Sequence, residues 1–201
     1  MLSKELIPFL MTGYPNLESS EQIAVDLLKR GVRTIEIGVP FSDPMADGPV
    51  IQHAAEQALK NGVRLSDCLA MVSRIKKQYP QARLILFTYL NPLLRYGLQN
   101  YARDAQIAGV AATLTVDLPL EEATEYLNVH RENKLGTVFL ASPTTSTTRL
   151  QKISEASSEF IYYVSRAGVT GAQKDLSISL GSELEKIKSQ VSRKIDRKSV
   201  V

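Results

Sequence analysis

Two carboxylates stand close together in the sequence but in different settings. Glu36 lies within residues 33–39, where β-branched residues do not alternate with polar ones, a pattern typical of a strand buried on both faces. Asp47 follows in a loop rich in proline and glycine that can fold back over that strand. Burying a carboxylate without a partner or a task is costly. Two carboxylates in such unlike surroundings should differ in proton affinity, as acid/base catalysis requires.

The composition is that of a globular chain. Its 201 residues are 44% hydrophobic and 22% charged, which is enough for one domain with a substantial core. No apolar run approaches the roughly 20 residues of a membrane span, and the N-terminus lacks the layout of a signal peptide, so we expect a cytoplasmic protein. The net charge is only +3, and the basic residues are not clustered with aromatic ones, which argues against nucleic-acid binding.

Metal binding is not expected either. Cys68 is the only cysteine, which excludes an internal disulfide and a cysteine-rich metal site, and its apolar helical neighbours predict a buried structural thiol. His53 and His130 lie on separate predicted helices, with no cysteine or carboxylate at the spacing of metal ligands. We therefore expect them to face solvent or to cap helices.

Strand-like and helix-like segments alternate along the chain, which predicts a parallel α/β architecture. The expected strands are residues 6–11, 33–39, 84–89, 110–116, 137–141 and 160–165. The expected helices are residues 19–30, 51–60, 66–79, 98–108, 120–132, 147–157 and 182–191. Six such βα units fit either a complete doubly wound sheet or an incomplete eight-stranded barrel.

The position of the polar residues favours the barrel. Neither a dinucleotide-binding glycine pattern nor a phosphate-binding P-loop is present, and residues 12–16 after the first strand do not supply one. In barrels, functional groups gather where strands end at the C-terminal face. Residues of this kind at or near the ends of strands two to six are Glu36, Tyr89, Asn91, Asp117, Pro119, Ser142, Pro143, Ser165 and Arg166.

Four segments together carry a family resemblance. Residues 36–49 read Glu-Ile-Gly-Val-Pro-Phe-Ser-Asp-Pro-Met-Ala-Asp-Gly-Pro, and residues 165–171 read Ser-Arg-Ala-Gly-Val-Thr-Gly. Residues 88–92 and 116–119 fit in order and spacing. From residue 7 to residue 171 the sequence resembles the tryptophan synthase α chain family. The resemblance implies a (β/α)8 TIM barrel that cleaves indole-3-glycerol phosphate to indole and glyceraldehyde 3-phosphate in a retro-aldol step.

The resemblance also implies roles for individual residues. Glu36 would supply and collect the mobile protons, and its apolar strand is expected to raise its proton affinity. Asp47 would stay ionised and hold the indole N–H as positive charge develops there. Tyr162 matches the active-site tyrosine of the family.

Other residues would enclose the substrate. Five apolar or aromatic residues end strands where a flat ring could be held, although core packing is the alternative for each of them. These residues are Phe9, Tyr89, Leu114, Leu140 and Val164. Residues 166–174 would form a loop that closes over the substrate, with Thr170 and Gly171 near the phosphate.

The resemblance implies a partner chain. Asp43, Pro44, Asn91 and Pro92 match family residues that face the β subunit, which receives indole through a tunnel. We therefore expect a β partner in a heterotetramer of two α and two β chains. No cofactor is expected in this chain, while pyridoxal phosphate is expected in the β partner. A free-standing indole-3-glycerol-phosphate lyase and a non-catalytic subunit that only binds β are the alternatives, and the β-facing residues weigh against the first.

The C-terminal part departs from the family, which continues for two more βα units that supply backbone N–H groups to the substrate phosphate. After Val191 the sequence shows no apolar strand followed by a glycine turn. We therefore expect an incomplete barrel over residues 1–195, with strands one and six as open edges and with weak or no activity.

Residues 196–201 are expected to be a non-native tail. They back-translate as GAT CGG AAG AGC GTC GTG, which matches the start of a widely used sequencing adapter whose next triplet is a stop. The gene would then run on. Amplification of the parent locus with outside primers tests this expectation, which is wrong if the locus encodes these residues and a stop.

Overall fold

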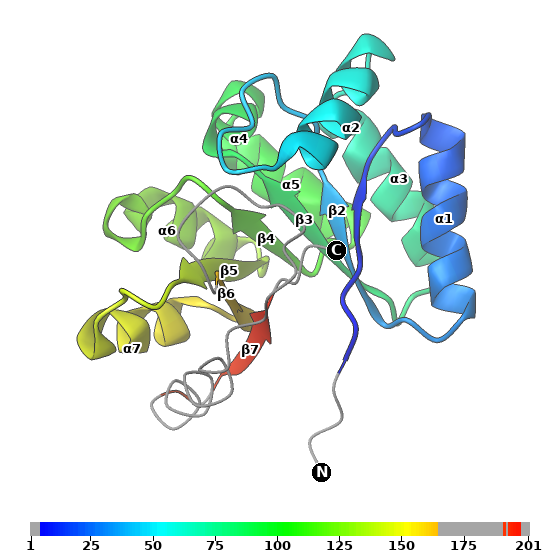
Figure 1. The fold of residues 1–201 in the computed structure, drawn as a ribbon. Helices are drawn as coiled ribbons and strands as arrows, with labels where there is room; N and C mark the ends of the chain where they lie inside the picture. The colour runs from blue at the N-terminus through cyan, green and yellow to red at the C-terminus, as the bar shows by residue number, and fades with distance from the viewer. Residues whose placement is uncertain (1–4, 165–190, 192, 198–201) are drawn as a thin grey trace, which may run out of the picture.

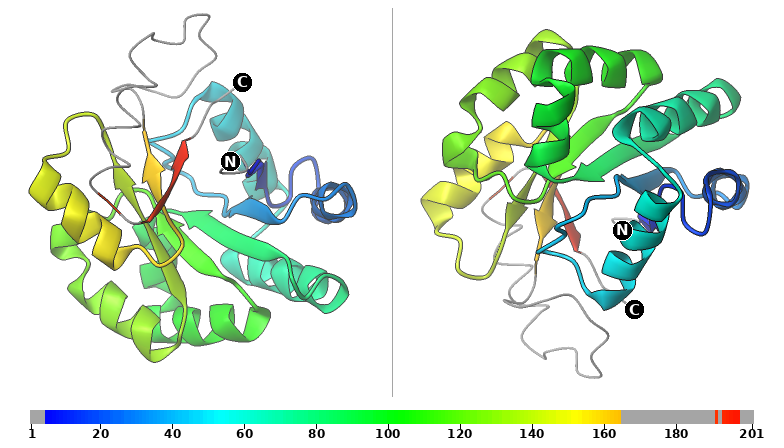
Figure 2. Two further views of the ribbon diagram at one scale, coloured as in Figure 1. Left: turned by 90° about the horizontal axis from the view of Figure 1, so that it is seen from below. Right: turned by 90° about the horizontal axis from the view of Figure 1, so that it is seen from above.

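The computed structural model describes residues 5–164, 191 and 193–197, and these residues form a curved parallel sheet covered by helices on its outer face (Figures 1 and 2). All pairs of neighbouring strands run parallel in the order β1 to β7. This is the architecture of a TIM barrel that is only partly built, as the sequence predicted. The strands are β1 (Phe9–Met11), β2 (Thr34–Gly38), β3 (Arg83–Thr88), β4 (Ala112–Thr115), β5 (Gly136–Ala141), β6 (Phe160–Tyr163) and β7 (Lys194–Arg197).

The helices alternate with the strands, as expected. They are α1 (Leu17–Lys29), α2 (Pro49–Lys60), α3 (Leu65–Gln78), α4 (Leu90–Tyr96), α5 (Leu98–Ala108), the 3-10 helix η1 (Leu120–Glu122), α6 (Thr124–Glu132) and α7 (Thr147–Ala156). No helix within these described residues is both long and apolar enough to cross a bilayer. The predicted helix over residues 182–191 lies outside the part of the chain that the structure describes.

Three helix predictions need correction. Helix α1 begins at Leu17 rather than at residue 19, because the Asn16 side chain caps it by accepting the N–H of Ser19 at 2.8 Å. Helix α4 was not expected; it is short and separated from α5 by Gly97, whose φ of +87° breaks the helical path. The single helix predicted over residues 120–132 is divided into η1 and α6 at Ala123.

The expectation of six strands with strand six as an open edge is wrong. Strand β7 pairs in parallel with β6, placing Ile161 beside Ile195 and Tyr162 beside Asp196. The side chain of Ile195 is half-buried against the outer core, so one apolar residue anchors a strand whose backbone satisfies the edge of β6. Strands β1 and β7 end the sheet order and do not pair with each other, so the barrel is not closed within the described residues.

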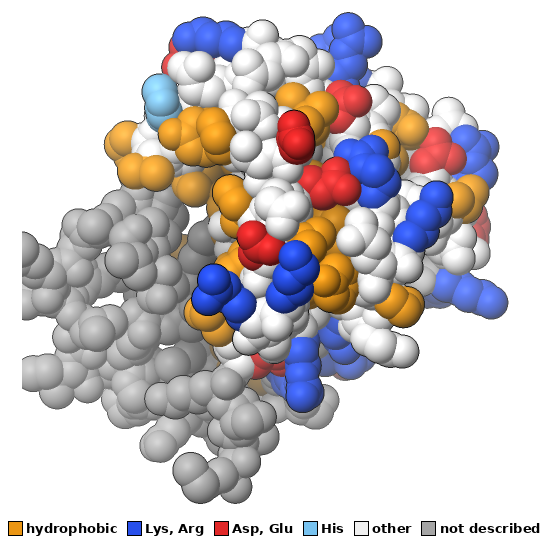
Figure 3. All heavy atoms as spheres, turned by 90° about the vertical axis from the view of Figure 1, so that its right-hand side faces the viewer, with side chains coloured by type: hydrophobic (Ala, Val, Ile, Leu, Met, Phe, Trp, Pro, Cys, Tyr) orange, Lys and Arg blue, Asp and Glu red, His pale blue; other side chains and the backbone are white. Residues whose placement is uncertain are grey.

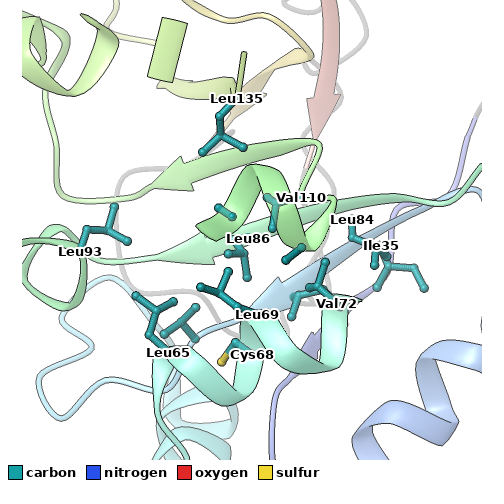
Figure 4. Packing of buried hydrophobic residues seen from close by; sticks show 14 of the residues in the cluster. Ile35, Leu65, Cys68, Leu69, Val72, Leu84, Leu86, Leu93, Val110 and Leu135 are labelled. Atoms are coloured by element: carbon teal, nitrogen blue, oxygen red, sulfur yellow. The ribbon is translucent and has the colours of Figure 1, made fainter. Parts of the chain in front are cut away.

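Two apolar clusters lie on opposite faces of the sheet. The larger one joins the outer face to the helices, and Figure 4 shows Leu69 and Val72 of α3 facing Leu84 and Leu86 of β3. Cys68 is fully buried in this cluster, as predicted, and burial raises the pKa of its thiol to about 12. The smaller cluster fills the inside of the curved sheet, where its buried members come from strands β3 to β6.

The two histidines differ in burial. His53 on α2 is exposed, as expected. The prediction of a solvent-facing or capping role is wrong for His130, which lies on the buried side of α6 and is 1% exposed. Its Nδ1 lies 2.8 Å from the backbone oxygen of Tyr126, and its ring stacks on the Tyr126 ring with centroids 3.8 Å apart. A buried polar cluster under α6 therefore replaces the expected surface position.

Candidate active site

Glu36 points into the barrel because the residues on either side of it point out. Ile35 and Ile37 of β2 belong to the outer core, and side chains alternate along a strand. In the sheet register Glu36 lies beside Phe9 of β1 and Ile85 of β3, and Ile85 belongs to the interior cluster. The Glu36 side chain is therefore held among apolar groups, with 2% of its surface exposed.

Asp47 returns to the same end of the barrel through the loop between β2 and α2. A turn closed by the Asp47 N–H on the Pro44 oxygen at 3.1 Å folds the loop back. The Gln52 side chain donates to the backbone oxygen of Asp47 at 2.8 Å and ties this residue to the first turn of α2. Asp47 is 6% exposed, so both carboxylates are buried although one lies on a strand and the other on a loop.

The Tyr89 hydroxyl holds the Asp47 carboxylate. Tyr89 follows β3 directly, and its Oη donates to Asp47 Oδ2 at 2.9 Å while accepting the N–H of Ala46 at 2.9 Å. Burial, followed by the charge of Asp47, raises the pKa of Tyr89 well above its ordinary value. The phenol therefore remains neutral and available as a donor.

Tyr162 of β6 completes the group. It is 4% exposed and belongs to the interior cluster. Burial is the main cause that raises the pKa of Tyr162 far above its ordinary value, and the charges of Glu36, Asp196 and Asp47 add to it. Residues from β2, from the β2–α2 loop and from β6 thus lie within electrostatic reach of one another at the interior of the sheet.

The apolar residues predicted to enclose a ring lie mostly together. Leu114, Leu140 and Val164 join Phe9 in the interior cluster, and the Phe9 ring meets Phe87 edge-on with centroids 5.3 Å apart. Tyr89 differs from these four, because its ring packs against Phe41 at 5.1 Å and its hydroxyl is the part that meets a site residue.

Glycine 38 makes room for this arrangement. A Cβ at Gly38 would lie 2.6 Å from the Phe9 ring, closer than real Cβ contacts allow. The close approach of ring and backbone explains why the last residue of β2 has no side chain. Thr170 and Gly171, expected near the phosphate, lie outside the described residues.

The residues expected to face a partner chain lie at the surface. Asp43 and Asn91 are exposed, and Pro44 and Pro92 are half-buried. Nearby in the sequence, three large apolar side chains are also open to solvent: Met45 at 89%, Val50 at 80% and Leu94 at 53%. By contrast, charges of both signs are interspersed on the face shown in Figure 3. Between two of the helices, Arg74 of α3 donates to Glu21 of α1 at 2.7 Å.

Some features of the site had no signal in the sequence. The Tyr89 hydroxyl was interpreted only as part of an aromatic wall, and Phe41 was not singled out. Asp196 lies beside Tyr162 in the register and therefore on the interior face, which places a third carboxylate there. Such contacts join segments far apart in the chain, so the folded structure reveals them and the sequence does not.

Comparison with known proteins places the chain in a family. The model of the family described as tryptophan synthase alpha chain matches residues 2–194. The chain belongs to the tryptophan synthase α chain family. It is 42% identical over 189 residues to the tryptophan synthase α chain of Geotalea daltonii, covering 94% of this chain and 71% of the relative. It is 44% identical over 183 residues to that of Roseiflexus castenholzii, covering 91% and 70%.

Solved structures agree with the family. The tryptophan synthase α subunit of Legionella pneumophila superposes with a TM-score of 0.91 at 36% identity, over 99% of this chain and 73% of that one. A tryptophan synthase structure from Mycobacterium tuberculosis gives a TM-score of 0.87 at 38% identity, over 96% and 73%. The resemblance inferred from the motifs is thus confirmed, and membership of this family implies a lyase of tryptophan biosynthesis with a β-chain partner.

Proposed function

We propose that this chain performs the α reaction of tryptophan synthase, the retro-aldol cleavage of indole-3-glycerol phosphate to indole and glyceraldehyde 3-phosphate. One observation carries the proposal: a buried glutamate and a buried, hydrogen-bonded aspartate lie at one end of an apolar barrel interior. An apolar space with a few convergent polar groups suits a flat aromatic ligand that must exchange protons.

Glu36 moves the protons in this mechanism. Its protonated form gives a proton to indole C3, so that the indole ring becomes positively charged at nitrogen. The Glu36 carboxylate then takes the proton of the glycerol hydroxyl. The carbon-carbon bond breaks as the aldehyde forms, and its electron pair restores the aromatic ring. The buried position of Glu36 favours the neutral acid that the first step needs.

Asp47 acts on the other side of the ring. Its carboxylate accepts the indole N–H and stabilises the positive charge that develops at nitrogen while C3 is protonated. The Tyr89 hydroxyl and the turn through Pro44 keep Asp47 in place before the substrate arrives. Such preorganisation avoids the reorganisation that water would require during the reaction.

A β chain is the proposed partner, because the exposed Asp43 and Asn91 lie in a region that also exposes Met45, Val50 and Leu94. Exposed apolar side chains of this size are typical of an interaction surface. A specific observation supports a second candidate, a non-catalytic chain that only binds β. The strands β1 and β7, at the two ends of the sheet, do not pair with each other, so the barrel is not closed within the described residues.

The test measures indole release from indole-3-glycerol phosphate by this chain with purified β subunit. We expect Glu36→Gln and Asp47→Asn each to lower the rate by about 10²- to 10⁴-fold. Glu18→Gln on the exposed surface of α1 serves as the matched control and should keep the full rate. A chain extended to eight βα units is measured in parallel.

The outcomes separate the candidates. Indole release that depends on Glu36 and Asp47 supports the lyase proposal. Release by the extended chain alone favours the non-catalytic candidate for the 201-residue chain. If neither chain releases indole, or if the two variants are as active as the control, the lyase assignment is wrong.

A further inference from the structure

Contacts with two loops fix Tyr89, the β2–α2 loop and the loop after β4. Its ring packs against Phe41 in the β2–α2 loop at a tilt of 34°. The next residue, Leu90, begins α4 and donates its N–H to Asp117 Oδ1, in the loop after β4, at 2.7 Å. The side chain itself is 4% exposed. Its position is therefore set by the loops after β2 and β4 together.

The two contacts of the hydroxyl are not interchangeable. A backbone N–H can only donate, so the N–H of Ala46 must donate to Tyr89 Oη. The single hydroxyl proton is then directed at the second neighbour, which is Asp47 Oδ2 at 2.9 Å. A donor that points at a carboxylate favours its ionised form over its protonated form. By occupying the acceptor side of the Tyr89 oxygen, the Ala46 amide directs the phenol proton toward the Asp47 carboxylate.

We propose that Tyr89 is a positioning residue that holds Asp47 as an oriented carboxylate, through a hydroxyl whose direction is fixed by the Ala46 N–H. This inference rests on the proposed function, in which an ionised Asp47 faces the indole nitrogen. It assigns to the hydroxyl a role that the aromatic ring alone cannot fill. Phenylalanine at this position would keep the ring contact with Phe41 and lose the control of Asp47.

The surrounding negative charges give the Tyr89–Asp47 hydrogen bond a function. Glu36 and Asp47 both act on Tyr162, and Asp117 acts with Asp47 on Tyr89, so several carboxylates share this end of the barrel. Neighbouring carboxylates disfavour each other's ionisation. A neutral donor that remains protonated gives one of them, Asp47, a specific reason to stay charged.

The test is a titration of Asp47 in this chain labelled with ¹³C at aspartate carboxyl groups, with its signal assigned through Asp47→Asn. We expect Tyr89→Phe to raise the pKa of Asp47 by about one unit, because the ionised carboxylate loses a donor. The Ala46 amide, losing its acceptor, should exchange with solvent about tenfold faster.

Tyr96→Phe is the matched control. Tyr96 donates to Asp104 Oδ2 at 2.8 Å in the same tyrosine-to-aspartate geometry, but on the helical surface of α4 and α5. This variant should shift Asp104 and leave Asp47 unchanged. A merely structural role for Tyr89 predicts reduced stability with an unshifted Asp47, and that result in a folded Tyr89→Phe chain would overturn the proposal.

Amide exchange in the unmodified chain provides a second test should Tyr89→Phe not fold. Protection of the Ala46 amide supports the proposal, whereas exchange at the rate of an open loop contradicts it. Because neither measurement requires turnover, the result stays separate from the proposed function. Normal indole release by Asp47→Asn would end the lyase proposal without changing the titration of Asp47.

Discussion

Buried polar residues in this chain are of two kinds. Glu36 and Asp47 lie at the interior side of the sheet, where we propose that the substrate binds. His130 faces the outer core, where Thr113 Oγ1 lies 3.3 Å from its Nε2 and the Tyr101 hydroxyl lies 2.6 Å from the same oxygen. The first kind is suited to chemistry, and the second holds α5 and α6 on β4. Burial alone therefore does not identify an active-site residue; the face of the sheet does.

His130 should make the fold sensitive to mild acid. Burial lowers its pKa to about 4, although the Tyr126 oxygen acts in the opposite direction, and an unfolded histidine has a pKa of about 6.5. As the pH falls below about 6.5, His130 becomes protonated in the unfolded chain but stays neutral in the folded chain. Stability is then lost down to about pH 4, by as much as about 3 kcal/mol.

Urea unfolding at a series of pH values tests this expectation. The free energy of unfolding should decline between about pH 6.5 and pH 5 in the unmodified chain. His130→Gln should flatten the decline, while His53→Gln on the exposed surface of α2 should preserve it. An equal slope in all three chains would contradict the assignment to His130.

At the scale of elements, close packing between strands shapes the site. Gly38 ends β2 against the Phe9 ring of β1, and that ring meets Phe87 of β3. Contacts from β2 and β3 therefore fix the position of the Phe9 ring on β1. Any side chain at Gly38 must displace it.

Gly38→Ala should lower stability by about 1–3 kcal/mol, because the new Cβ overlaps the Phe9 ring and the neighbouring ring contacts limit relaxation. It should also weaken indole binding at the interior cluster. Gly31→Ala is the control: nothing lies within 4 Å of its Cβ position, so only its φ of +93° is strained. Denaturation and indole titration measure both effects, and unchanged indole binding by Gly38→Ala would count against a ligand site at Phe9.

The sequence predicted these elements unequally, for physical reasons. Strands buried on both faces and amphipathic helices have strong local patterns, so the order of strands β1 to β6 and most helices was correct. Helix α4 is a single short helix after Tyr89 and leaves little periodicity to detect. The site followed from a motif in which Glu36 and Asp47 are near in sequence. The Tyr89 hydroxyl bond joins residues far apart, and no local pattern encodes it.

At the scale of the whole molecule, the sheet ends in a strand with few apolar residues. Strand β7 covers the edge of β6, and its Ile195 is the residue packed against the core. The sequence missed it because Lys194–Arg197 lacks the apolar pattern of the other strands; backbone pairing supplies what side chains do not. The prediction that residues 196–201 are non-native remains a prediction.

Ile195→Asn should therefore loosen β7 and expose the edge of β6. We expect a loss of about 1–3 kcal/mol in unfolding free energy, together with association at higher concentration as the free edges pair between chains. Lys194→Asn, an exposed neighbour in the same strand, should change stability by less than about 0.5 kcal/mol. Urea unfolding and light scattering provide the measurements. If both variants behave alike, β7 is not held by Ile195.

The aromatic rings inside the sheet have an optical consequence. Phe9, Phe87 and Tyr162 line the interior in ring-to-ring contact, and the chain contains no tryptophan. The protein itself therefore absorbs little at the long-wavelength end of the near-ultraviolet, where indole still absorbs and tyrosine and phenylalanine do not. An indole bound in this apolar interior would fluoresce without background emission from tryptophan. Its emission would be shifted to the blue, and energy transfer from nearby tyrosines would also excite it. Indole fluorescence would therefore measure the fraction of protein with bound indole, without an added label.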